Sequence, residues 1–211
     1  MKRNSRRMTE DTSPKNLRKF LESDDPAMVR MGLSMAKGSG VPDELLPTIL
    51  GLYMWNNDKN IRAAAKSVFT KWAPEEIQAK VKNNWKASYR TLSVRSQKKG
   101  SVYFSEKTGL AKIIPELINE FKSKEYTAVI LYPYTKILKS KPPHDYDFFR
   151  NIEAAAEALG ELGELSRDNK TASFVGPVTV KPLIQSLELH KNDAACVHIE
   201  RALKKLGHEV E

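Results

Sequence analysis

Residues 153–164 read Glu-Ala-Ala-Ala-Glu-Ala-Leu-Gly-Glu-Leu-Gly-Glu, and this stretch decides the fold. Its apolar residues and its glutamates each recur at helical spacing, on opposite faces: Ile152, Ala155, Ala156, Leu159 and Leu162 against Glu153, Glu157, Glu161 and Glu164. The apolar face is mostly alanine, and small side chains allow a neighbouring helix to approach closely. The stretch therefore predicts an amphipathic helix that packs tightly against another helix.

A second helix is predicted at 180–188, which reads Val-Lys-Pro-Leu-Ile-Gln-Ser-Leu-Glu. Larger apolar residues follow the same spacing here, at Val180, Leu183, Ile184 and Leu187. A helix with a large-residue face beside a helix with a small-residue face forms one unit of a helical stack.

Repetition along the chain supports such a stack. Residues 56–62 repeat the pattern of residues 24–30 after 32 positions, which matches Val29 with Ile61 and Arg30 with Arg62. A proline early in the first helix of a pair is a second marker, found at Pro47, Pro115 and Pro182. The intervals between these prolines, 68 and 67 residues, are about twice a unit of roughly 34, a length typical of helical repeats.

These stretches resemble HEAT-like repeats, in particular the type found in phycobilisome lyases and in many bacterial and archaeal scaffold proteins. The resemblance covers about 13–208 and is strongest at 24–30, 56–65, 153–164 and 180–188. It implies an all-α fold, a right-handed α-solenoid of about five to six antiparallel helix pairs. We expect these pairs at about 14–38, 42–72, 75–96, 108–139 and 178–207, with one further helix at 146–164.

The domain prediction is a disordered basic tail at 1–12, which has few large apolar residues, followed by a single solenoid domain at 13–211. Within that domain, Ser13 and the aspartates before Pro26 are predicted helix N-caps. The sequence Gly38-Ser-Gly40 is a predicted helix stop. Long connections are expected at 96–106 and 166–176.

The content of 40% hydrophobic and 29% charged residues is typical of a soluble protein. The chain has 211 residues and no apolar run of the roughly 18 residues that would span a bilayer. No hydrophobic segment follows its basic first residues, so no secretory signal is expected. The single cysteine, Cys196, cannot form an intrachain disulfide, which is typical of a reducing compartment and predicts a cytoplasmic location.

The net charge of +9 is concentrated in two blocks. Residues 1–20 carry +5 and residues 80–112 carry +8, whereas the rest of the chain carries −4. Such an asymmetry indicates an anionic partner without specifying which one.

Metal and nucleophile chemistry find little support in the sequence. The candidate ligands Cys196 and His198, with His190 and His208 nearby, lack the four-ligand spacing of structural zinc. A buried cysteine beside surface histidines is the expectation, and no metal or cofactor is predicted. The sequence also lacks a Gly-x-Ser-x-Gly elbow. The iron-binding His-Glu pairs of the HEAT-repeat deoxyhypusine hydroxylases are absent too, so we do not expect an enzyme.

Alkylpurine DNA glycosylases built from HEAT-like helix pairs raise a third possibility. They hold a damaged nucleotide with an aspartate and tryptophans. Trp55 and Asp58 are three residues apart and could share a helix face. Asp58 also fits an ordinary helix-cap position, which explains it without chemistry.

The sequence offers a candidate site for a polyanion between residues 80 and 112. Its cations and aromatics are Lys80, Lys82, Trp85, Lys86, Tyr89, Arg90, Arg95, Lys98 and Lys99. In a helix, Lys82, Lys86 and Arg90 would form one ridge, with Trp85 and Tyr89 beside it. Such a ridge can neutralise successive phosphates while an aromatic stacks on a base. The alternative is that Trp85 and Tyr89 are core anchors and the lysines a solvated face.

The sequence therefore leaves three functional hypotheses. The first is a non-enzymatic scaffold or adaptor whose concave helical surface binds a protein partner. The alternative is RNA or DNA binding through the basic and aromatic residues at 80–112. A glycosylase- or lyase-like enzyme is the third. None of these hypotheses involves a membrane, and the sequence does not predict an oligomeric state.

Overall fold

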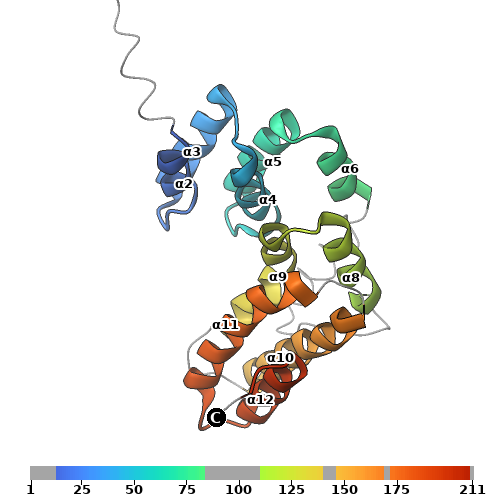
Figure 1. Ribbon diagram of the computed structural model, residues 1–211. Coiled ribbons are helices and arrows are strands. Elements are labelled where there is room, and N and C mark those ends of the chain that lie inside the picture. The colour runs from blue at the N-terminus through green and yellow to red at the C-terminus, as the bar shows by residue number, and fades with distance from the viewer. Residues whose placement is uncertain (1–12, 84–109, 140–145, 169–171, 210–211) are drawn as a thin grey trace, which may run out of the picture. The chain divides into compact units, whose positions relative to one another are not determined.

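The computed structural model describes residues 13–83, 110–139, 146–168 and 172–209 (Figure 1). These residues form ten α-helices and one short 3-10 helix, and they contain no strand. This confirms the all-α prediction. None of the helices in the described ranges combines the length and the apolar character needed to cross a bilayer. The tail predicted at 1–12 and the connection predicted at 96–106 lie outside the described residues.

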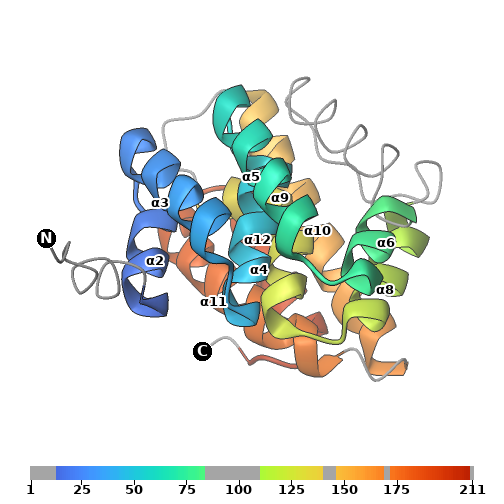
Figure 2. The same cartoon turned by 90° about the horizontal axis from the view of Figure 1, so that it is seen from above.

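The chain divides into two compact units, Met1–Lys82 and Asn83–Glu211. The N-terminal unit contains α2 (Pro14–Leu21), α3 (Pro26–Ser39), the 3-10 helix η1 (Asp43–Leu45), α4 (Leu46–Trp55), α5 (Lys59–Trp72) and α6 (Glu75–Asn83). Helices α2 and α3 pack together, as do α4 and α5, and α3 also packs against α5 (Figure 2). The helix pairs predicted at 14–38 and 42–72 are therefore confirmed. Of the pair predicted at 75–96, the described residues contain α6.

Helix starts in this unit follow from local capping chemistry. The N–H of Asn16 donates to Ser13 Oγ (3.2 Å) before α2, and the N–H of Ala27 donates to the Asp25 carboxylate (2.8 Å) before α3. These are the predicted N-caps. Helix α3 ends at Ser39, and Gly40 then takes a φ of 101°, a value that favours glycine. The predicted stop at 38–40 is thus confirmed.

The two matched segments of the sequence repeat have matched roles. Val29 and Ile61 are both buried in the core. Arg30 Nε donates to the carbonyl of Pro26 (3.2 Å), and Arg62 Nη1 donates to the carbonyls of Asn56 (2.6 Å) and Asn57 (2.8 Å). Each arginine therefore holds the turn that starts its own helix.

The C-terminal unit contains α8 (Leu110–Phe121), α9 (Lys124–Leu138), α10 (Tyr146–Asp168), α11 (Ala172–His190) and α12 (Ala195–Lys205). These helices confirm the predicted pairs at 108–139 and 178–207 and the predicted helix at 146–164. Helix α11 packs against α9, α10 and α12, and α9 also packs against α8 and α10.

Two expectations about this unit are wrong. Helices α10 and α11 extend toward each other, so only residues 169–171 separate them instead of a long connection at 166–176. Pro182 therefore lies inside α11 and not near its start. Buried Val175 and Thr179, one turn apart, continue the packed face of α11 toward its N-terminus, and this packing outweighs the cost of the two interior prolines, Pro177 and Pro182.

The deciding stretch lies in α10, and the five residues of its predicted apolar face, Ile152, Ala155, Ala156, Leu159 and Leu162, are all buried. Its tightest packing is against α12. A Cβ at Gly160 would lie 2.9 Å from Ala202 Cα, and one at Gly163 would lie 2.5 Å from Leu206 Cδ2. Small residues thus permit the close approach that the sequence predicts. Helix α11, which contains the segment 180–188, also packs on α10, but the neighbours of Gly160 and Gly163 come from α12 and the residue after it.

Candidate polyanion-binding surface on α3 and α5

The site predicted at 80–112 lies almost entirely outside the described residues. Trp85, Lys86, Tyr89, Arg90, Arg95, Lys98 and Lys99 all fall there, so the predicted ridge stays a prediction. Lys80 and Lys82 belong to α6. Lys80 Nζ lies 2.7 Å from Glu76 Oε1, and this hydrogen bond and the lysine charge lower the pKa of the Glu76 carboxyl. Lys80 is therefore neutralised locally within its own helix.

The two residues of the glycosylase hypothesis lie on different elements. Trp55 is the last residue of α4, whereas Asp58 is the N-cap of α5, so the two do not share the face of one helix. Asp58 Oδ1 accepts the N–H of Asn60 at 2.7 Å. The structure thus gives Asp58 the capping role that the sequence already offered.

Cys196, His190 and His198 of the C-terminal unit are engaged in protein contacts. Cys196 was expected to be buried but is only half-buried, and its thiol donates to Glu200 Oε1 (3.3 Å). Partial burial raises the pKa of this thiol, as do the hydrogen bond and the charge of Glu200. His198 Nδ1 lies 2.8 Å from Glu157 Oε1. His190 is fully buried, with Nδ1 3.0 Å from Asp193 Oδ2, which corrects the expectation of a surface residue. Within the described ranges, no group of three or more His, Cys, Asp or Glu side chains could hold a metal ion.

A different surface of the N-terminal unit carries an unbalanced charge. Residues 13–82 contain eleven Lys/Arg and eight Asp/Glu, and six of the eleven cations lie on α3 and α5. Neither of these two helices contains an acidic residue. Five of the six cations are exposed: Arg30, Lys37, Lys59, Lys66 and Lys71. Two adjacent helices therefore present positive charge alone.

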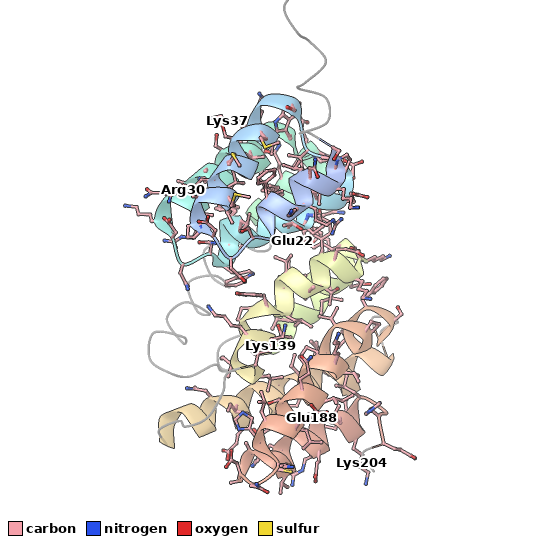
Figure 3. The ribbon with its side chains drawn as sticks, turned by 90° about the vertical axis from the view of Figure 1, so that its left-hand side faces the viewer. Glu22, Arg30, Lys37, Lys139, Glu188 and Lys204 are labelled. Atoms are coloured by element: carbon pink, nitrogen blue, oxygen red, sulfur yellow. The ribbon has the colours of Figure 1, made fainter. Side chains whose placement is uncertain are left out.

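The spacing of these cations is regular. Arg30 and Lys37 are seven residues apart on α3, and Lys59 and Lys66 are seven apart on α5. Seven residues are about two helical turns, or about 10.5 Å along the axis, so each pair shares a face. Figure 3 labels Arg30 and Lys37 on the exposed outer side of the N-terminal unit.

Several of the other exposed residues on the two helices are small. They are Ala27 and Ser34 on α3, and Ala63, Ser67 and Thr70 on α5. None of them is long enough to screen the flanking lysines. The large exposed side chains on the two helices, apart from the cations, are Met31 and Trp72.

Lys71 joins the two helices. Its Nζ donates to the carbonyl of Lys37 (2.8 Å), and Trp72 Nε1 donates to the same oxygen (3.3 Å). These bonds fix the end of α5 against the end of α3. We call the exposed faces of Pro26–Ser39 and Lys59–Trp72 the α3–α5 surface.

The carboxylates of the N-terminal unit lie elsewhere, at helix starts and turns and on the neighbouring helices. Asp25 and Asp58 are N-caps. Glu22 and Glu44 pair with Arg18 of α2 at 3.5 and 3.6 Å. None of the five exposed cations of the α3–α5 surface pairs with a carboxylate in the part of the chain that the structure describes. Their fields therefore add instead of cancelling.

Comparison with known proteins gives no further guide to this surface. No protein-family model matches the chain, and no curated protein or solved structure matches it at a significant level. The case for a binding site thus depends on the geometry and charge of the α3–α5 surface.

Proposed function

We propose that this chain is a non-enzymatic binding protein of the HEAT-like type, a right-handed solenoid of five to six helix pairs. We further propose that its N-terminal unit binds the phosphate backbone of a nucleic acid through the α3–α5 surface. One observation carries the proposal: two adjacent helices hold five exposed cations and no carboxylate.

Phosphate contacts are the chemistry that such a surface favours. Lysine and arginine neutralise backbone phosphates and release condensed counterions, which gives sequence-independent affinity. A protein partner, the first expectation from the repeat resemblance, would need a strongly acidic surface to fit here. A nucleic acid carries a negative charge at every backbone phosphate. We therefore argue for a nucleic acid and treat an acidic protein as an outcome of the test.

The proposal predicts how strongly the affinity for DNA depends on salt concentration. If four of the five cations each neutralise one phosphate of duplex DNA, the slope of log K against log salt is about −3.6. Affinity would then fall roughly 150-fold between 50 and 200 mM salt. Binding that is independent of salt over this range would contradict phosphate contact.

The decisive experiment compares two neutralised pairs in the full chain. Lys59→Gln with Lys66→Gln removes two cations from the α3–α5 surface. Lys15→Gln with Lys19→Gln removes two exposed cations from α2 and is the matched control. We expect the first variant to bind a labelled oligonucleotide more weakly and to reduce the salt slope by about two, because each phosphate contact contributes about one.

Three results would decide the question. Equal losses in both variants would show non-specific attraction to net charge and refute a defined surface. A wild-type protein that retains no oligonucleotide but captures an acidic protein after nuclease treatment would favour the scaffold hypothesis. Unchanged binding in both variants, with loss only when Lys82, Lys86 and Arg90 become glutamate, would move the site to the block at 80–112.

A further inference from the structure

Exposed apolar side chains mark the same two helices that carry the cations. In the described part of the N-terminal unit, the large hydrophobic residues that remain exposed are Met31 on α3 (45%) and Trp72 on α5 (38%). Trp72 holds the end of α3 through its indole N–H, but its exposed ring, like the exposed thioether of Met31, contributes nothing to phosphate binding. Their presence on these helices therefore points to a ligand with apolar faces as well as negative charge.

The indole of Trp72 is fixed in place. Its Nε1 donates to the Lys37 carbonyl (3.3 Å), and Lys71 Nζ lies 4.6 Å from the ring centroid while donating to the same oxygen. The ring thus sits beside the ammonium of Lys71 and the backbone of Lys37. An aromatic that is already held in one orientation loses little conformational entropy when a ligand stacks on it.

We propose that the α3–α5 surface binds single-stranded nucleic acid, with phosphates on its lysines and an unpaired base against Trp72. This inference rests on the proposed nucleic-acid function. A duplex hides its base faces within its own stack, whereas a single strand can turn a base onto an aromatic side chain. Lys71 has a flexible four-carbon stem, so its ammonium can leave the indole and follow a phosphate.

Met31 supplies a second apolar contact on the same surface. It precedes Lys37 by six residues, which is about 9 Å along the axis of α3. Its unbranched thioether adapts to flat or irregular partners and contacts aromatic rings favourably. The exposed face of α3 thus offers Met31 to a strand that is anchored at Trp72.

The test uses the full chain, a labelled 20-nucleotide single strand and a duplex of the same length. We expect wild-type protein to bind the single strand at least about fivefold more tightly, because one stacked base is worth roughly 5- to 150-fold. Trp72→Leu should remove this preference, whereas Trp72→Phe should keep most of it. Both variants lose the indole N–H, so the pair isolates the aromatic face from the hydrogen bond to Lys37.

The possible outcomes distinguish a failure of the single-strand inference from a failure of the proposed nucleic-acid binding. Equal, salt-dependent affinity of wild-type protein for single strand and duplex would overturn the inference and leave nucleic-acid binding intact. No binding to either probe would overturn both. Equal loss of single-strand binding in the Leu and Phe variants would show that Trp72 acts only by holding α3, and would overturn the stacking role.

Fluorescence provides a readout that does not depend on altering Trp72. In a protein with Trp55→Phe and Trp85→Phe, the only tryptophan emission comes from Trp72. We expect a saturating single strand to quench this emission and the duplex to leave it unchanged. Unchanged emission with bound single strand would overturn the inference. Circular dichroism of each variant confirms that its helices are intact.

Discussion

The contact between α10 and α12 predicts that alanine at Gly160 destabilises the C-terminal unit. A Cβ at this position would lie 2.9 Å from Ala202 Cα and 3.2 Å from Ala202 Cβ. The first of these atoms belongs to the backbone, so no rotamer change can relieve the clash. Helix α12 must shift away from α10 as a body.

Two opposing terms set the size of the effect. Replacing glycine by alanine inside a helix stabilises it by about 1 kcal/mol. Forcing an extra methyl group into a packed interface costs about 1–3 kcal/mol. The expected net result is a loss of about 1 kcal/mol in the free energy of unfolding.

Gly38 is the control for helix propensity. It lies inside α3, and a Cβ there would meet no atom within 4 Å. Gly38→Ala should therefore gain about 0.5–1 kcal/mol from helix propensity alone. The two Gly→Ala variants should differ by about 2 kcal/mol with opposite signs.

Urea unfolding followed by far-UV circular dichroism measures both variants. Tryptophan emission would not serve, because Trp55, Trp72 and Trp85 all precede α8. If Gly160→Ala stabilises the protein as much as Gly38→Ala, α10 and α12 are not in close contact at Gly160. The inference that small residues on α10 permit the close approach of α12 would then be wrong.

Three further predictions concern single side chains. Asp58→Ala should lower the free energy of unfolding by about 1 kcal/mol through loss of the α5 N-cap, whereas Asp58→Asn, which can still cap, should not; equal losses would refute the capping role. Tyr134→Phe should change stability by less than about 0.5 kcal/mol, because the buried hydroxyl of Tyr134 has no hydrogen-bond partner among the described residues. A loss above 1 kcal/mol in urea unfolding would reveal a partner such as a bound water. Glu200→Gln should lower the raised pKa of the Cys196 thiol, since it removes a charge and a carboxylate acceptor that favour the protonated form. Iodoacetamide should then alkylate Cys196 faster at pH 8, because more of it is thiolate, and an unchanged rate would contradict this.

Helix positions could be predicted because their signals are local. A capping aspartate acts on an amide two residues away, and the periodicity of 153–164 lies within one helix. The start of α11 could not be predicted in this way. Ser173 and Gly176 resemble a loop, and only burial of Val175 and Thr179 against other helices makes the segment helical. That burial depends on tertiary neighbours, which a single sequence does not display.

The candidate surface was missed for a related reason. The sequence draws attention to 80–112 because its cations are contiguous. The cations of the α3–α5 surface are spread over 26–39 and 59–72, with the acidic residues Asp43, Glu44 and Asp58 between them. One signal was available: both segments lack Asp and Glu. It becomes informative only once α3 and α5 are known to pack side by side.

The carbonyl of Lys37 couples ligand binding at the α3–α5 surface to the stability of the final turn of α3. Its two donors come from residues 34 and 35 positions later in the chain. A ligand that draws Lys71 toward itself removes one of them and must loosen the final turn of α3. Because such coupling is reciprocal, a change that loosens the final turn of α3 would raise the affinity for the ligand. The N–H of Gly40 donates to the Ala36 carbonyl (3.0 Å) in this final turn. Faster amide hydrogen exchange at Gly40 would then report a bound ligand, although Gly40 does not belong to the α3–α5 surface.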